Sequence, residues 1–395
     1  MKQKNKKLLA LTAAALTLPG MTPKSVQAQA VPEKYTASYR YTEYKEDDQP
    51  ADKTREGDAL TRYDISIHQF SLVAPVASDI SLNVDIATES MSGASPWYVI
   101  EGADGKPIQV MSGATIDESR DDIAFAANFY RETSRIGIGV ARSSENDYES
   151  KSANINSTIW LNGNNTTLDV GFGFSDDEIT PTQSPSIDPN RTREEDKSSE
   201  SLSAGISQVV NKTLLVGAGI GYAVYDGYLS DPYKFAFLED SPLLRDNRPD
   251  EKKQLSLDLR LRKYFTNYAG ALHADYRLYD NDWGVTSHTL SLGWYQNIET
   301  WQLSTRLRWY DQSAANFYRN FYTTERADGY YSSDYRLSAY SAIGFKLGVS
   351  KSFEFGTFSI AYENYDSGKG RDSDGDLNPG LVDFDFISIG FDYKF

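Results

Sequence analysis

Two pairs of arginines stand two residues apart, Arg260 with Arg262 and Arg306 with Arg308. In a β-strand, residues i and i+2 point to the same face, so each pair would place two guanidinium groups on one surface. If the strands close into a barrel with this face inward, a basic wall lines the lumen. The same alternation places three more basic residues on this wall, Arg277, Arg336 and Lys346. It also places three acidic residues on the opposite side of the barrel, Asp64, Asp85 and Glu89.

A basic wall facing an acidic wall would create a transverse field across a water-filled lumen. Such a field orients and selects charged solutes. The alternative is that the charges pair with one another in a filled lumen and only stabilise it. The parity of these residues is compatible with both interpretations.

A second group of acidic residues resembles a calcium loop, because oxygen ligands at alternating positions can wrap one hard cation. The candidate ligands are Asp372, Asp374, Asp376 and Asn378. The sixth position, normally glycine, is Leu377, and no flanking helices are expected. The alternative is an acidic hairpin tip, and no other cofactor is predicted.

Catalytic chemistry has few candidates in this chain. There is no cysteine and there are three histidines, His68, His273 and His288. Ser287 and Thr289 flank His288, but adjacent residues of a strand point to opposite faces, so they do not form a hydrolase site with it. No zinc-protease motif, phosphate-binding loop or dinucleotide fingerprint occurs. We therefore expect no enzyme, with an outer-membrane enzyme as the minor alternative.

The elements that must position these side chains are strands of alternating polarity. Leu255, Leu257, Leu259 and Leu261 recur at every second position, with polar or charged residues between them. Period-2 alternation gives a strand one apolar and one polar face. Sixteen such segments follow one another between residues 35 and 395. Tyr63, Ile65 and Ile67 are expected on the apolar face of the second, and the fourteenth is predicted over 337–349.

The connections between these segments alternate in length. Short turns such as 162–165 and 266–267 are separated by long polar connections such as 91–116, 226–251 and 312–333. Short turns at one end and long loops at the other are typical of bacterial outer-membrane barrels. A soluble sandwich or propeller is the alternative, but it has no reason to alternate in this way. The sequence therefore predicts an all-β, up-and-down antiparallel transmembrane barrel of about 16 strands, with short periplasmic turns and long extracellular loops.

The final segment supports insertion into a membrane. Ile389, Phe391, Tyr393 and Phe395 alternate with small or charged residues, and the sequence ends on the last of these aromatic rings. An unpaired amphipathic strand invites aggregation, whereas in a closed barrel it pairs with the first strand. The pattern resembles the insertion signal of outer-membrane barrels. Phe384 and Phe386 are out of phase with it, which predicts a bulge or the outer end of the strand near residue 385.

The first 30 residues have the features of a secretory signal peptide: a run of lysines, a short apolar stretch and Ala28-Gln29-Ala30 as a cleavage site. The predicted organisation is a signal peptide over 1–30 and an outer-membrane barrel over 31–395. The formal net charge of −16 argues against a nucleic-acid partner. The 27 Tyr, 18 Phe and 6 Trp fit aromatic girdles at the two membrane interfaces.

Several stretches near the long connections are more specific than periodicity. They are Met91-Ser92-Gly93-Ala94-Ser95-Pro96, Met111-Ser112-Gly113-Ala114-Thr115, Gly227-Tyr228-Leu229-Ser230-Asp231-Pro232-Tyr233-Lys234, Asp246-Asn247-Arg248-Pro249-Asp250, Asp282-Trp283-Gly284, Ser287-His288-Thr289 and Ala314-Ala315-Asn316-Phe317-Tyr318. In this order they resemble the uncharacterised bacterial family known as domain of unknown function 3570. The resemblance implies an exported barrel and transfers no catalytic residue. These motifs either fold the loops over the mouth or form a ligand-facing surface.

We predict a porin-like channel or transporter for small charged solutes in the cell outer membrane. The alternative is a non-conducting barrel with a structural or partner-docking role. The expected partners are outer-membrane lipid, lipopolysaccharide and the barrel-assembly machinery. An inserted loop is expected to pack beside inward-facing glycines such as Gly171 and Gly219, with part of 91–116 as the candidate segment.

Overall fold

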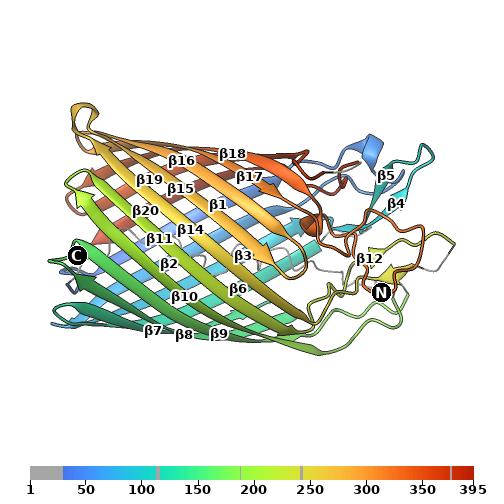
Figure 1. The fold of residues 1–395 in the computed structure, drawn as a ribbon, viewed down its shortest axis with the longest axis horizontal. Coiled ribbons are helices and arrows are strands. Elements are labelled where there is room, and N and C mark those ends of the chain that lie inside the picture. Colours follow the sequence, from blue (N-terminus) through green and yellow to red (C-terminus); the bar gives the residue numbers. More distant parts are fainter. Residues whose placement is uncertain (1–29, 113–115, 187, 241–242, 374–375) are drawn as a thin grey trace, which may run out of the picture.

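The computed structural model describes residues 30–112, 116–186, 188–240, 243–373 and 376–395, and the predicted signal peptide lies almost entirely outside them. Within these residues, sixteen antiparallel strands close into one barrel, as predicted (Figure 1). The strand order around the wall follows the chain, interrupted only by two small hairpins, β4–β5 and β12–β13, which stand apart from it. Among the described residues, no helix is long and apolar enough to cross a bilayer.

The barrel strands are β1 (Thr36–Glu46), β2 (Asp64–Ala77), β3 (Ile80–Gly93), β6 (Ile116–Tyr130), β7 (Ser134–Ser144), β8 (Tyr148–Leu161), β9 (Thr166–Ile179), β10 (Glu195–Asn211), β11 (Leu214–Gly227), β14 (Glu251–Phe265), β15 (Gly270–Asn281), β16 (Thr286–Ile298), β17 (Trp301–Gln312), β18 (Tyr340–Phe353), β19 (Gly356–Gly368) and β20 (Phe384–Lys394). The additional hairpins are β4 (Pro96–Glu101) with β5 (Pro107–Met111), and β12 (Phe235–Ala236) with β13 (Leu244–Arg245). The described residues also form three short 3₁₀ helices: η1 (Ala51–Lys53), η2 (Thr266–Tyr268) and η3 (Tyr335–Leu337).

The barrel closes between its first and last strands. β1 and β20 pair antiparallel without a register shift, from Thr36 opposite Lys394 to Glu46 opposite Phe384. Beyond the strands, the rings of Tyr35 and Phe395 stack with their centroids 5.5 Å apart. There is no bulge near residue 385, and β20 simply begins at Phe384. Phe384 and Phe386 have the lumen-facing parity of this strand and pack against Tyr44, which accounts for their phase.

The outer surface of the wall is apolar. Alternate residues such as Leu202, Leu259 and Phe172 are 56%, 55% and 46% exposed. A soluble monomer rarely exposes such a continuous apolar band, whereas a barrel in lipid requires one. At the end with the short turns, the exposed aromatic rings of Tyr268, Trp301 and Phe355 extend it. Aromatic rings are the residues that prefer a membrane interface.

The expected orientation of β2 is wrong. Phe70 and Leu72 are exposed on its outer face, so Ile65 and Ile67 point into the barrel. Ile65 is buried there with Tyr44 and Tyr63. The alternation rule assumes a wet lumen, but the lumen at this end of β2 is filled by apolar side chains.

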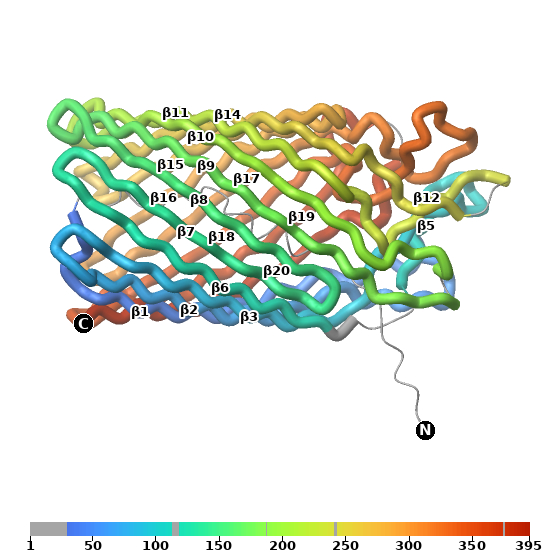
Figure 2. The backbone as a smooth tube through the Cα atoms, turned by 90° about the horizontal axis from the view of Figure 1, so that it is seen from below, coloured from blue at the N-terminus to red at the C-terminus, as the bar shows by residue number. Residues whose placement is uncertain are grey.

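The long loops gather at one end of the barrel (Figure 2). Three hydrophobic clusters lie at this end, and together they define what we call the cap. The first contains Tyr63 and Tyr233, the second Trp283 and Phe317, and the third Tyr322 and Tyr331. The small hairpins β4–β5 and β12–β13 belong to the same end of the molecule (Figure 1).

Candidate functional site

The predicted basic wall is formed by β14 to β18. Its members have the parity opposite to that of the exposed apolar residues and therefore face the lumen: Arg260 and Arg262 on β14, Arg277 on β15, Arg306 and Arg308 on β17, and Lys346 on β18. The register places Arg262 opposite His273, and Arg306 opposite both Gly293 and Lys346. His273 is itself opposite Gly293, so Arg262, His273, Gly293, Arg306 and Lys346 form one row across the five strands β14 to β18.

Part of the basic wall is neutralised by its own carboxylates. Asp275 lies 2.7 Å from Arg262 and 3.6 Å from Arg260. Asp258 accepts a hydrogen bond of 2.6 Å from Arg277. Glu363 lies 3.1 Å from Lys346. These pairs fix the positions of the long basic side chains on the lumen surface.

Arg306 and Arg308 differ from the rest of the wall. Among the described residues, neither makes an ion pair with a carboxylate. Arg306 donates to the Tyr295 hydroxyl at 3.2 Å, and the guanidinium of Arg308 lies 5.3 Å from the centre of the Tyr310 ring. Since their partners are neutral, these two arginines contribute positive charge to the wall that no paired carboxylate offsets.

The acidic wall lies across the barrel and is smaller than predicted. β3 is third and β15 eleventh in the strand order, so seven strands lie between them in either direction around the barrel. Asp85 on β3 is exposed on the lumen side, and Glu89 is paired with Arg120 of β6. The prediction for Asp64 is wrong, because it shares the outward parity of Phe70 and Leu72.

A third stretch of wall, over β7 to β11, carries small uncharged side chains. Gly137 lies beside Asn156, Gly171 beside Ser203, and Gly217 beside Ser207. The neighbours that a Cβ would meet at these positions belong to the wall itself, and none comes from the described part of loop 91–116. That part forms the β4–β5 hairpin at the end with the long loops and is not inserted beside these glycines (Figure 1). In the middle of these strands the small residues leave this side of the lumen without long side chains, whereas Arg135 and Trp160 point inward nearer the short turns.

Arg336 does not belong to the lumen wall. The structure places it in η3, because β18 begins at Tyr340 and not at residue 337. It lies inside the cap, where its guanidinium contacts Asp334 and lies 2.9 Å from Asp231. The prediction for this residue is corrected accordingly.

Around Arg336 lies a group of six buried or nearly buried ionic residues, which we call the cap ion cluster. It consists of Asp231, Lys234, Asp246, Arg248, Asp334 and Arg336. Arg248 bridges Asp246 at 2.7 Å and Asp334 at 2.8 Å. Lys234 donates to the carbonyl of Pro96 at 2.8 Å and so joins the β4–β5 loop. Three carboxylates balance three cations, as buried charges require.

The central carboxylate of this cluster is Asp334, whose side chain is 0% exposed. Burial alone would raise the pKa of Asp334, but the positive charges of Arg336, Lys234 and Arg248 hold it well below its usual range. Burial lowers the pKa of the Lys234 ammonium, an effect that Asp334 and Asp231 oppose. The cluster is thus a charged network that depends on each of its members.

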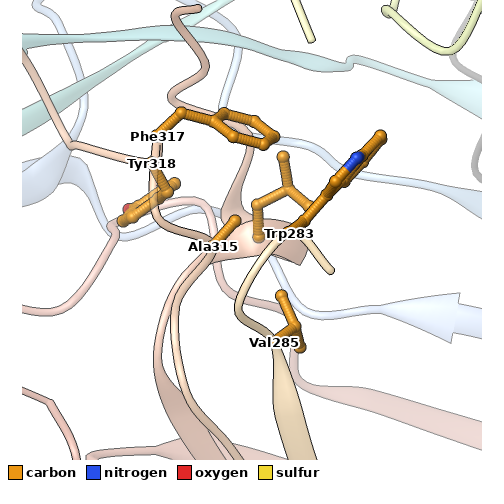
Figure 3. Close-up of a cluster of buried hydrophobic side chains, with 6 residues drawn as sticks. Trp283, Val285, Ala315, Phe317 and Tyr318 are labelled. Carbon is orange, nitrogen blue, oxygen red and sulfur yellow. The ribbon is translucent and has the colours of Figure 1, made fainter. Parts of the chain in front are cut away.

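The sequence motifs outside the strands build this cap. Asp231 and Lys234 come from one motif, and Asp246 and Arg248 from the next. Trp283 and Phe317, from two further motifs, pack edge to face with their centroids 5.3 Å apart (Figure 3). The structure therefore supports the interpretation that these motifs fold the loops over the mouth.

The calcium candidate lies at the rim of the cap. Asn378 is 3% exposed, and its amide donates to the Tyr318 hydroxyl and the Ser333 carbonyl. Its side-chain oxygen accepts from the Gly380 N–H at 2.7 Å. Asp374 lies outside the described residues, and Asp372 and Asp376 are in the loop beside it. The calcium site stays a prediction.

The histidines lie apart from one another. The ring of His68 forms a 2.9 Å hydrogen bond with the Tyr39 hydroxyl, and His288 a 2.7 Å bond with the Tyr276 hydroxyl. Both pairs have outward parity. His273 faces the lumen and packs against Tyr295, with ring centroids 4.3 Å apart.

Sequence reasoning missed several charged residues of the lumen, and one of them is Glu363 on β19, the partner of Lys346. Arg40 on β1 and Arg120 and Asp122 on β6 all point inward, and Arg120 pairs with Asp122 at 3.2 Å. The same parity rule, applied to 36–46 and 116–130, would have found them. The cap ion cluster has no such signal, since its members come from connections far apart in the sequence.

The comparisons with known proteins agree on the fold. No curated protein matches the sequence. CdiB from Acinetobacter baumannii has a TM-score of 0.51 at 8% identity, covering 92% of this chain and 60% of that one. A bacterial polysaccharide outer membrane secretin has a TM-score of 0.48 at 8% identity, covering 91% and 98%. OpdQ from Pseudomonas aeruginosa has a TM-score of 0.42 at 8% identity, covering 92% and 98%.

At these identities the similarity concerns the fold alone. The family model is more specific. It is described as "Protein of unknown function (DUF3570)" and matches residues 8–383, which is nearly the whole sequence. The resemblance of the loop motifs is thereby confirmed, and the chain belongs to the DUF3570 family.

Proposed function

We propose that this protein is a porin-like channel of the cell outer membrane for small charged solutes. The observation that carries the proposal is the arrangement of charge in the lumen. Arg306 and Arg308 lack carboxylate partners among the described residues, and Asp85 lies on the opposite part of the wall. β17 begins at Trp301 and β3 at Ile80, both directly after a short turn. Arg306 and Asp85 therefore each lie five residues from the short-turn end of their strand.

Opposed charges at similar depth create a field across the path of a solute, which favours charged or dipolar molecules. The Gly, Ser and Asn residues of β7 to β11 support the proposal, since they leave room beside the charged wall. We propose no catalytic role for the lumen residues. The outward parity of His68 and His288 supports this view, because neither side chain is directed at the solute path.

The test is conductance and reversal potential of the purified, folded protein in a planar lipid bilayer under a salt gradient. We expect conduction, and we expect R306Q with R308Q to shift selectivity towards cations. The matched control is R142Q with K151Q, which removes the same charge from an outward-facing cross-strand pair. Absence of conductance from correctly folded protein would overturn the proposal.

A second candidate is a non-conducting barrel that docks a partner at its outer face. The cap favours it, because buried clusters and ion pairs tie the loops across the mouth. In that case a variant with an opened cap would conduct no better than the wild type. We further propose that the apolar band contacts outer-membrane lipid and lipopolysaccharide. The barrel-assembly machinery would recognise the last strand, and the exposed alternate side chains of Ile389, Tyr393 and Phe395 support this role.

A further inference from the structure

The cap contains a cavity of about 400 Å³ between the β4–β5 hairpin, the loop after β9 and the β12–β13 hairpin. We propose that it binds a hexopyranose ring. Six residues that carry the argument line it: Trp97, Tyr98, Phe235, Leu243, Asp188 and Arg245. The site is separate from the lumen charges, and the proposal does not depend on conduction.

The cavity offers flat apolar surfaces in fixed positions. The Trp97 and Phe235 rings meet edge to face, with centroids 5.8 Å apart and planes at 84°. Tyr98 approaches the same ring at 6.3 Å and 79°. Phe235 is buried, which holds the two other rings in place. Such rings suit a ligand that has an apolar face of C–H groups, as pyranose rings do.

The polar groups are few and partly unused. Asp188 accepts from the Arg245 guanidinium at 2.5 Å and from the Asn190 N–H at 3.3 Å through Oδ1. Its Oδ2 is buried and accepts no hydrogen bond from the described residues, and Arg191 Nε lies 3.8 Å from it. The indole N–H of Trp97 is also buried without a described acceptor. Unsatisfied buried polar atoms are costly. Each of these two atoms exposes less than 1 Å², so a ligand reaches them only when the covering side chains move. The Arg245 side chain, which also lines the cavity, is 44% exposed and needs no such movement.

The charges narrow the class of ligand. A simple cation would meet Arg245 and Arg191, and a simple anion would meet Asp188. A hydroxyl can donate to Asp188 Oδ2, and a neighbouring hydroxyl can accept from Trp97 or Arg245. An uncharged polyhydroxylated ring with one apolar face satisfies all three conditions. Its source is either a free sugar or the sugar chain of lipopolysaccharide.

The test is saturation-transfer NMR on the detergent-solubilised full chain. One arm uses free glucose, galactose, mannose and N-acetylglucosamine, and the other uses purified lipopolysaccharide. We expect binding in at least one arm, weakened at least about tenfold by D188N and also reduced by W97F, which removes the indole N–H and keeps an aromatic ring. The control is D104N, an exposed acid in the turn of the same β4–β5 hairpin.

Binding in the first arm assigns the site to free sugars, and binding in the second alone assigns it to the outer leaflet. No binding in either arm would overturn the proposal. Binding that D188N and D104N leave equally strong would overturn it as well, because the ring would then be held elsewhere. The intensity of the folded band on unheated gels shows whether each variant has folded.

Discussion

Replacing Asp334 with Asn removes one charge from the centre of the cap ion cluster. Asp334 accepts from Arg336 Nε at 2.9 Å and from Arg248 Nη2 at 2.8 Å, and its side chain is fully buried. Both guanidinium groups would remain without their shared carboxylate. Breaking a buried pair in this way costs about 3 to 5 kcal/mol. We expect this loss to appear as opening of the cap and not as unfolding of the barrel.

The measurement is hydrogen exchange of the backbone amides of Asn247 and Tyr331. Each N–H donates to the carbonyl of the other residue at 2.8 Å, and these two hydrogen bonds join two loops of the cap. Since about 1.4 kcal/mol corresponds to a factor of ten, exchange should accelerate by about two to three and a half orders of magnitude in D334N. Amides in the middle of the barrel strands should not change.

The chain contains a matched control in the same loop. Arg326 and Asp328 form an ion pair at 2.5 Å with the same sequence spacing, but their side chains are 23% and 42% exposed. Exposed pairs contribute about 1 kcal/mol or less, so D328N should change exchange by about a factor of five at most. If both variants exchange at the same rate, the reasoning about the buried cluster is refuted.

Three further predictions concern other parts of the molecule. Burial raises the pKa of Glu145 to about 7, Arg120 opposes this, and nearby carboxylates add to it. Because the pKa of Glu145 lies above the ordinary glutamate value of 4.5, protonated Glu145 stabilises the folded state fully below pH 4.5. This stabilisation is lost as the pH rises through about 7. E145Q should therefore flatten the pH profile of the denaturation midpoint, whereas a profile like that of the wild type would contradict the assignment. F395A removes the ring that stacks on Tyr35 and should fold into liposomes about threefold to tenfold more slowly. The folding rate is measured from the mobility of the folded band on gels. An unchanged rate would show that the stack forms after the slow step of folding. G227A should lower the free energy of unfolding in denaturant by about 3 kcal/mol, because φ of Gly227 is +109° and a Cβ would clash with the Asp196 carbonyl oxygen. In the control G329A, φ is +73° but the space around the Cβ is open, so the loss should be about 1 kcal/mol. Equal losses in the two variants would argue against the clash.

The strand pattern was predictable wherever both faces of the wall have a constant environment. Between Leu255 and Leu261 the outward residues are apolar and exposed and the inward ones are polar, so polarity reports orientation directly. The inward direction of Arg260, Arg262, Arg306 and Arg308 followed from the same rule. The number of strands followed from counting these segments and from the alternating lengths of their connections.

The rule failed at the capped end, where the inside of the barrel is itself apolar. Ile65, Phe384 and Phe386 are hydrophobic and yet point inward, because they pack with Tyr44 beneath the loops. The position of Arg336 was mistaken for a related reason, since alternation continues from the loop into β18 without a break in the pattern. Asp231 and Arg336 are 105 residues apart in sequence, and no periodicity connects them.

The pairing of β1 with β20 has a consequence for biogenesis. It joins Thr36 to Lys394, a separation of 358 residues (394 − 36), so the ring of hydrogen bonds can be completed only after the entire intervening chain has been made. Until then, a partly assembled sheet presents two unpaired edges with apolar side chains, the form most prone to stick to other chains. Contacts of such long range also form slowly. The interval between synthesis and closure is therefore when this protein most needs protection by chaperones.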